Sequence, residues 1–168
     1  MHILVALCLP LAGLFGQSSP PSDLAGRWEG ELSYIKDGQA QKLKIVEFNI
    51  DDQGLVTGRY AIFNDPKDLG VLTGGKINKD FVLDELFFRF KEGASATSRL
   101  DGPIELIGTG ESALIRSKVV ENPKRAFRYR DFHSTGRLDD ETYPAKIELR
   151  RIKPGASAPT SFYPKALL

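Results

Sequence analysis

From Leu24 onward, apolar residues recur at every second position in short runs, and this period constrains the fold more than any other feature of the chain. In residues 27–35, for example, Trp28, Leu32 and Tyr34 fall on one side and charged or small polar side chains on the other. A period of two is that of a β-strand with one face buried and one face in water. No stretch beyond the N-terminal segment sustains the spacing of an amphipathic helix. The pattern therefore predicts an all-β protein.

Short turn-like segments such as KDGQ, DDQG and NKD separate the alternating runs. Sequential strands joined by short turns pair antiparallel, because parallel neighbours need long crossovers. Eight or nine such strands would leave open edges unless the sheet closes on itself. We therefore expect an antiparallel up-and-down β-barrel of about eight strands, with a two-sheet β-sandwich as the alternative. The candidate strands are 27–35, 42–50, 55–63, 70–77, 81–90, 98–107, 112–120, 126–138 and 143–152.

Some local features refine this prediction. The alternation of the second candidate strand changes phase after Ile45, which predicts a β-bulge there. Residues 98–120 are compatible with one long bent strand or with two strands. Glycines inside the candidate strands favour a barrel, because they permit sharp coiling and close backbone approach. These glycines are Gly30, Gly58, Gly74 and Gly108.

The N-terminal segment 1–18 contains no Asp, Glu, Lys or Arg and is apolar over most of its length. This composition is that of a cleaved signal peptide. Its apolar run is shorter than the ~20 residues that a membrane-spanning helix needs, so no transmembrane segment is expected. Cys8, the only cysteine, lies inside this segment, and the mature chain would fold without disulfides. The segment predicts a secreted or periplasmic protein.

Composition also divides the rest of the chain. Residues 19–23, within SSPPSD, are rich in Pro and Ser and are expected to form a linker. The β-barrel domain is then expected to span residues 24–153. The tail, residues 154–168, carries three prolines and is expected to be extended.

The balance of charge argues against partners that bind by a global electrostatic field. The chain has 23 basic and 22 acidic residues, for a formal net charge of +1. Basic and aromatic residues do alternate in the segment NPKRAFRYRDF, but a half-buried strand with outward arginines explains this pattern. No nucleic-acid partner is therefore predicted, and the oligomeric state is left open.

The segments AGRWEGEL and DDQGLVTGRYAI resemble the first two glycine-marked strands of calycin barrels, the lipocalins and especially the avidins. The resemblance implies a barrel in which Trp28 packs across the closed end as a plug. It does not extend to biotin binding: where avidins place an Asn and a Ser to hold the ureido group, this chain has Gly30 and Tyr34. Only Tyr60 matches, and Trp28 is the only tryptophan, so the later tryptophans that wrap the ligand are missing.

The candidate ligand-binding residues are three tyrosines expected on inward faces, Tyr34, Tyr60 and Tyr129. Hydroxyl groups among apolar walls would orient a small ligand. Equally, they would cap a filled core by reaching water at the barrel mouth. The leading hypothesis is an exported, non-enzymatic binder of a small apolar or amphipathic ligand. The alternative is a filled structural or surface-interaction barrel with no such ligand.

Enzymatic activity ranks lowest among the hypotheses. His133 is the only histidine after the signal segment, and on a strand the adjacent Ser134 points away from it. A zinc site of the His/Cys type cannot be assembled from one histidine and no cysteine. The sequence therefore predicts no catalytic residues, no metal site and no cofactor.

Overall fold

The computed structural model describes residues 22–132, 141–153 and 155. The predicted signal segment 1–18, most of the linker and nearly all of the tail lie outside the described residues, as does His133. Ser22 and Asp23, which we expected in the linker, form a short 3-10 turn with Leu24.

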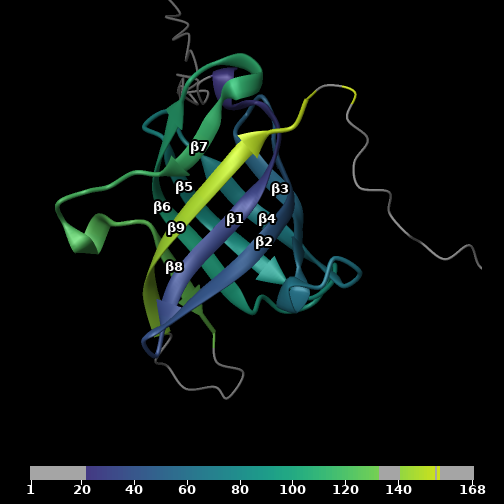
Figure 1. Cartoon of the computed structure of the whole chain (residues 1–168), viewed down its shortest axis with the longest axis vertical. Coiled ribbons are helices and arrows are strands. Elements are labelled where there is room, and N and C mark those ends of the chain that lie inside the picture. Colours follow the sequence, from purple (N-terminus) through teal and green to yellow (C-terminus); the bar gives the residue numbers. More distant parts are fainter. Residues whose placement is uncertain (1–21, 133–140, 154, 156–168) are drawn as a thin grey trace, which may run out of the picture.

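Nine strands make up a single sheet that closes into a barrel (Figure 1). The hairpin turns and short 3-10 segments between them match the turn-like sequences. The strands are β1 (Gly26–Lys36), β2 (Gln39–Ile50), β3 (Leu55–Ala61), β4 (Leu69–Ile77), β5 (Val82–Arg89), β6 (Ser98–Ile107), β7 (Leu114–Ser117), β8 (Arg128–Asp131) and β9 (Glu141–Arg151).

Every neighbouring pair of strands is antiparallel, and the order follows the chain from β1 to β6. β9 closes the barrel by pairing with β1 from Trp28↔Arg151 to Tyr34↔Ala145. β7 and β8 together fill the one position between β6 and β9. The predicted up-and-down barrel of eight strand positions is thus confirmed, and the sandwich alternative is wrong because one closed sheet holds all the strands.

The sequence did not predict that two short strands, β7 and β8, share one position in the barrel. β7 runs along one half of β6, the chain then leaves the sheet over residues 118–127, and β8 resumes the pairing along the other half of β6. Two hydrogen bonds from Arg128 to the Asp101 carboxylate, at 2.9 and 3.0 Å, hold the returning chain against β6. The predicted strand 126–138 is shortened accordingly, and its last residues lie outside the described part. Residues 98–120 contain two strands, β6 and β7.

The bulge in β2 is confirmed. Trp28 pairs with Phe48, but Gly30 pairs with Ile45, so β2 carries one extra residue at this point. Glycine is required nearby for a steric reason: a Cβ at Gly30 would lie 1.9 Å from the Glu148 carbonyl oxygen of β9. Such close approach of neighbouring backbones lets the sheet coil tightly enough to close.

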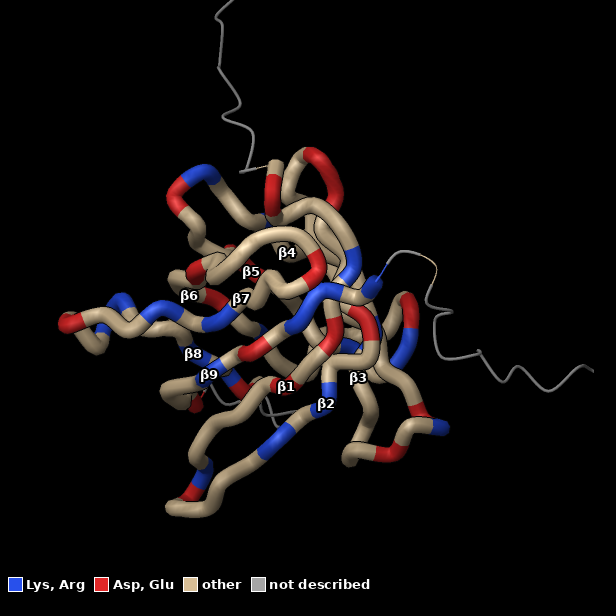
Figure 2. Tube along the Cα trace, turned by 45° about the horizontal axis from the view of Figure 1, so that its top comes forward, with Lys and Arg blue, Asp and Glu red and all other residues tan. Residues whose placement is uncertain are grey.

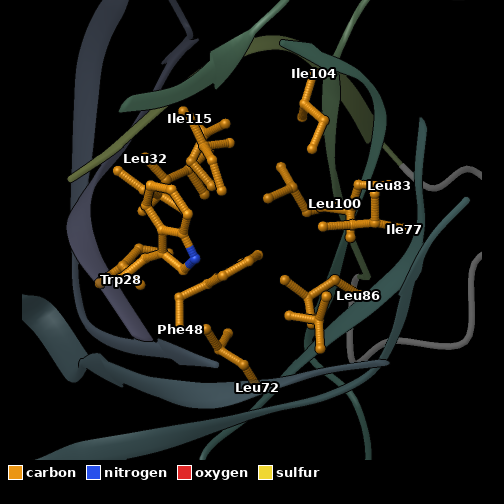
Figure 3. Packing of buried hydrophobic residues seen from close by; sticks show 14 of the residues in the cluster. Trp28, Leu32, Phe48, Leu72, Ile77, Leu83, Leu86, Leu100, Ile104 and Ile115 are labelled. Atoms are coloured by element: carbon orange, nitrogen blue, oxygen red, sulfur yellow. The ribbon is translucent and has the colours of Figure 1, made fainter. Parts of the chain in front are cut away.

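Inward-facing side chains fill the barrel (Figure 3). Its core contains large residues that are at most 1% exposed, including Trp28, Phe48 and Phe88. We call the end that holds Trp28 the tryptophan end, and the opposite end, which holds Tyr34 and Tyr129, the tyrosine end. The β1–β2 hairpin belongs to the tyrosine end, and the 3-10 turn Ser22–Leu24 to the tryptophan end.

Candidate functional site

The structure brings the three predicted tyrosines together at the tyrosine end. The rings of Tyr34 and Tyr129 stack with centroids 4.3 Å apart. The Phe88 ring meets Tyr129 edge-on at 5.8 Å and Tyr60 edge-on at 5.0 Å, so Phe88 links the tyrosines into one cluster. Tyr143 of β9 extends the cluster, 5.8 Å from Tyr34. Sequence reasoning missed Tyr143, although its place on a predicted strand was a signal.

Burial and hydrogen bonding explain the protonation of these tyrosines. Tyr60 and Tyr129 are only 5% and 7% exposed. Burial raises the pKa of Tyr129 well above its usual value, and a hydrogen bond with Ser98 only partly offsets this. Burial likewise raises the pKa of Tyr60, against a hydrogen bond with Thr97, and of Tyr34. The hydroxyl groups therefore have protein partners and stay neutral at ordinary pH.

The rim of the tyrosine end is polar. Lys36 Nζ bonds the Asp131 carboxylate at 2.8 Å, which raises the pKa of Lys36. Partial burial, with a hydrogen bond to Glu141, raises the pKa of Tyr143 to about 12. The arrangement is a stack of mutually packed rings closed by an ion pair, and it offers no free hydroxyl to a ligand in this conformation.

Trp28 lies fully buried at the other end of the barrel. Its Nε1 donates a hydrogen bond to the Leu24 carbonyl at 3.0 Å, and the Arg151 guanidinium lies over its ring at 4.3 Å. Arg151 also donates to the Ala25 and Asp23 carbonyls, which fastens the incoming chain across the barrel end. A hollow of about 280 Å³ beside Arg151 opens to solvent there.

A larger groove, of about 790 Å³, lies on the outside of the barrel. Its floor is formed by β2, β1, β9 and β7, and the chain that leaves the sheet after β7 adds Val119, which is 91% exposed. The volume falls within the range of about 300–1,000 Å³ typical of ligand sites. Neither this groove nor the smaller hollow is lined by the three predicted tyrosines.

Both acidic and basic residues line the groove. The charged lining residues of β1 are acidic, whereas basic and acidic residues alternate along β9 (Figure 2). Glu31 of β1 lies directly opposite Glu148 of β9, an arrangement that is unfavourable on its own. Lys42 pairs with Glu31 at 2.9 Å and Arg150 with Glu148 at 3.6 Å. The charged lining residues are Glu29, Glu31, Lys44, Arg116, Lys146, Glu148 and Arg150.

The sequence contained the signal for these residues, since alternation places them outward. Their convergence follows from the closure of β9 onto β1, which no local pattern records. Among residues 22–132 and 141–153, no group of three or more His, Cys, Asp or Glu side chains is arranged to hold a metal ion. Within the same residues, no helix has the length and apolar character to cross a membrane.

The fold and the site define a closed antiparallel β-barrel with a packed interior and a charged outer groove. This architecture is compatible with the calycin-like fold that the sequence resembles. Comparison of the chain with protein-family models, with curated proteins and with solved structures found no significant match.

Proposed function

We propose that this protein is an exported, non-enzymatic β-barrel that binds a polypeptide partner through its outer groove. The observation that carries the proposal is the contrast between the filled core around Trp28 and Phe48 and the groove of about 790 Å³ outside it. The sequence supports export through residues 1–18. Membership of the calycin superfamily is part of the proposal, with the interior site of that superfamily replaced by an exterior one.

The groove favours a partner with charges of both signs. Glu31 and Glu148 face one another, and a cationic side chain of the partner would add to the compensation that Lys42 and Arg150 already provide. Lys44 of β2 and Lys146 of β9 would meet anionic side chains. Charge complementarity of this kind contributes more to specificity and association rate than to raw affinity.

A direct test uses the full chain and a blocked hexapeptide of alternating lysine and glutamate, followed by amide chemical shifts. We expect the shifts to change mainly around Glu29, Glu31 and Glu148, and the change to disappear in Glu148→Lys. Asp80→Lys, which makes the same charge change on an exposed turn residue, is the matched control and should bind normally. Equal loss in both variants would refute a groove-specific site.

A second candidate function is the binding of a small apolar ligand at the tyrosine end, favoured by the clustering of Tyr34, Tyr60 and Tyr129. A ligand there would have to displace packed rings. Native mass spectrometry of gently purified protein separates the two functions. The groove proposal expects the mass of the bare chain, whereas a co-purified species that Tyr60→Ala releases would establish the interior site.

A further inference from the structure

The first half of β2 forms an open edge of the sheet. β2 pairs with β1 from Lys36↔Gln39 onward, but its pairing with β3 begins only at Ile45↔Tyr60. Among the residues that the structure describes, residues 39–44 therefore have a strand neighbour on one side only. Figure 1 shows this part of the β1–β2 hairpin at the lower end of the barrel. An open edge presents backbone N–H and C=O groups to which another strand can be added.

One side chain already makes part of such a pairing. Asn64 Oδ1 accepts a hydrogen bond from the Lys44 N–H at 3.1 Å, and Asn64 Nδ2 donates to the Lys42 carbonyl at 2.9 Å. The amide takes the place of a peptide group from a neighbouring strand. Because alternate residues of a strand point their backbone groups the same way, the edge also presents the Ala40 N–H and C=O and the Lys42 N–H. No described residue bonds to these three groups.

The side chains along the edge define what an added strand must carry. Ala40, Lys42 and Lys44 are exposed on the outer face, whereas Gln41 and Leu43 are half-buried on the inner face. An added strand continues the sheet, so its own residues alternate between these two rows. Acidic side chains would lie beside the lysines, and apolar side chains would lie beside Leu43, which packs against the core.

An exposed aromatic residue, Phe63, lies next to the Lys44 end of this edge in the chain segment that contacts it through Asn64. Phe63 directly precedes Asn64, is 90% exposed and has a φ of 50°, a left-handed conformation that bulky residues rarely adopt. The two hydrogen bonds of Asn64 to β2 hold the neighbouring backbone in place. Exposed aromatic side chains on a fixed backbone are frequent anchors of protein interfaces.

A second copy of the chain does not suit this edge. Antiparallel pairing of two such edges would bring the lysines of one copy against those of the other, and like charges opposite one another disfavour pairing. Lysine on an edge strand is a common device against self-association. Figure 2 shows the basic residues along the first half of β2, with an acidic residue only at the hairpin turn. The charge favours a different, acidic chain.

We propose that residues 39–42 of β2 bind an extended acidic polypeptide segment by strand addition, with the segment ending against Asn64 and Phe63. Its sequence alternates Asp or Glu with apolar residues. The backbone groups of this site lie on the side of β2 opposite β1, although the Lys44 side chain also lines the groove. The site does not depend on the proposed function of the groove.

The probe is a labelled, end-blocked hexapeptide of alternating glutamate and valine, added to the full chain. We expect binding by fluorescence polarisation, and protection of the Ala40 and Lys42 amides from hydrogen exchange. The same peptide N-methylated at every second residue should bind at least about tenfold more weakly, because it lacks the backbone donors. A lysine–valine peptide should also bind more weakly. Equal binding of the parent and N-methylated peptides would overturn the proposal.

Two variants locate the site. Ala40→Pro removes a backbone N–H that points away from β1, so the β1–β2 hydrogen bonds of the hairpin remain. The affinity for the peptide should fall about tenfold. Ala40→Ser keeps the N–H and is the matched control. Lys42→Ala leaves the backbone intact and should weaken binding of the glutamate–valine peptide but not of the lysine–valine peptide. Glu148→Lys, in the groove, should leave this peptide's affinity unchanged. If Glu148→Lys instead abolishes binding, the peptide occupies the groove and strand addition is refuted, while the groove function stands.

Discussion

The two ends of the barrel are closed by different chemistry. At the tryptophan end, Trp28 is fully buried, makes one hydrogen bond to a main-chain carbonyl and is covered by Arg151. At the tyrosine end, Tyr34 and Tyr129 stack, share hydrogen bonds with their neighbours and lie beneath the Lys36–Asp131 ion pair. One closure depends on apolar burial, and the other on rings whose polar groups must all find partners.

The difference shows what kind of change each end tolerates. The stability that apolar burial provides does not depend on pH. Removing a buried apolar side chain lowers the free energy of unfolding strongly, because the lost transfer free energy and the cost of the cavity add. Each hydrogen bond of the tyrosine end contributes less to the free energy of unfolding than the burial of a large apolar side chain does. The tyrosine end does, however, respond to pH, because its hydroxyl groups can lose their protons. All four tyrosines among the described residues belong to the tyrosine end, so any alkaline sensitivity of the barrel should begin there.

The largest expected effect is at the tryptophan end. Trp28→Ala should lower the free energy of unfolding by about 3–5 kcal/mol, because it empties a fully buried site and leaves the Leu24 carbonyl without its donor. Urea denaturation followed by circular dichroism measures the loss. Trp28→Phe keeps a ring and should lose less. A loss in Trp28→Ala below about 1 kcal/mol would mean that the indole does not seal this end.

A smaller effect is expected at the tyrosine end. Tyr129→Phe keeps the ring that stacks on Tyr34 but removes the hydroxyl that bonds Ser98, so it should cost about 1 kcal/mol. The same urea titration applies, with Tyr143→Phe on the rim as the control that should change stability less. If Tyr129→Phe proved as destabilising as Trp28→Ala, the contrast between the two closures would be lost.

The smallest effect at neutral pH, and the most specific, is the response to alkali. The folded pKa of Tyr143 is about 12 against 10.0 for a free tyrosine, and that of Tyr129 is also raised. The unfolded chain therefore loses these protons first, so their contribution to stability is complete below pH 10 and is lost as pH rises toward 12. Unfolding midpoints measured across this range should fall, and less so in Tyr143→Phe. Hydrogen exchange that rises first around Trp28 would contradict the assignment to the tyrosine end.

Much of the architecture was predictable from local patterns. Period-two alternation identified the strands, the phase change after Ile45 identified the bulge, and inward alternation selected Tyr34, Tyr60 and Tyr129. The same rule placed Glu31 and Glu148 outward. These predictions succeed because side-chain direction in a strand depends only on position along the chain.

Other features depend on which strands become neighbours. Glu31 faces Glu148 only because β9 closes against β1, 117 residues further along the chain. β7 and β8 share one position because the chain leaves the sheet over residues 118–127 and returns beside Asp101. The open edge at residues 39–44 exists because β3 ends before it can cover the whole of β2.

The sequence by itself determined the strands, their antiparallel succession and the faces on which apolar and charged residues lie, since alternation and turn chemistry act over a few residues. Only the tertiary structure decided that the tyrosines pack against one another instead of around a void, and that the groove lies outside. The physical reason is that the space inside a closed sheet depends on strand number, tilt and stagger together, and these are set by long-range pairing.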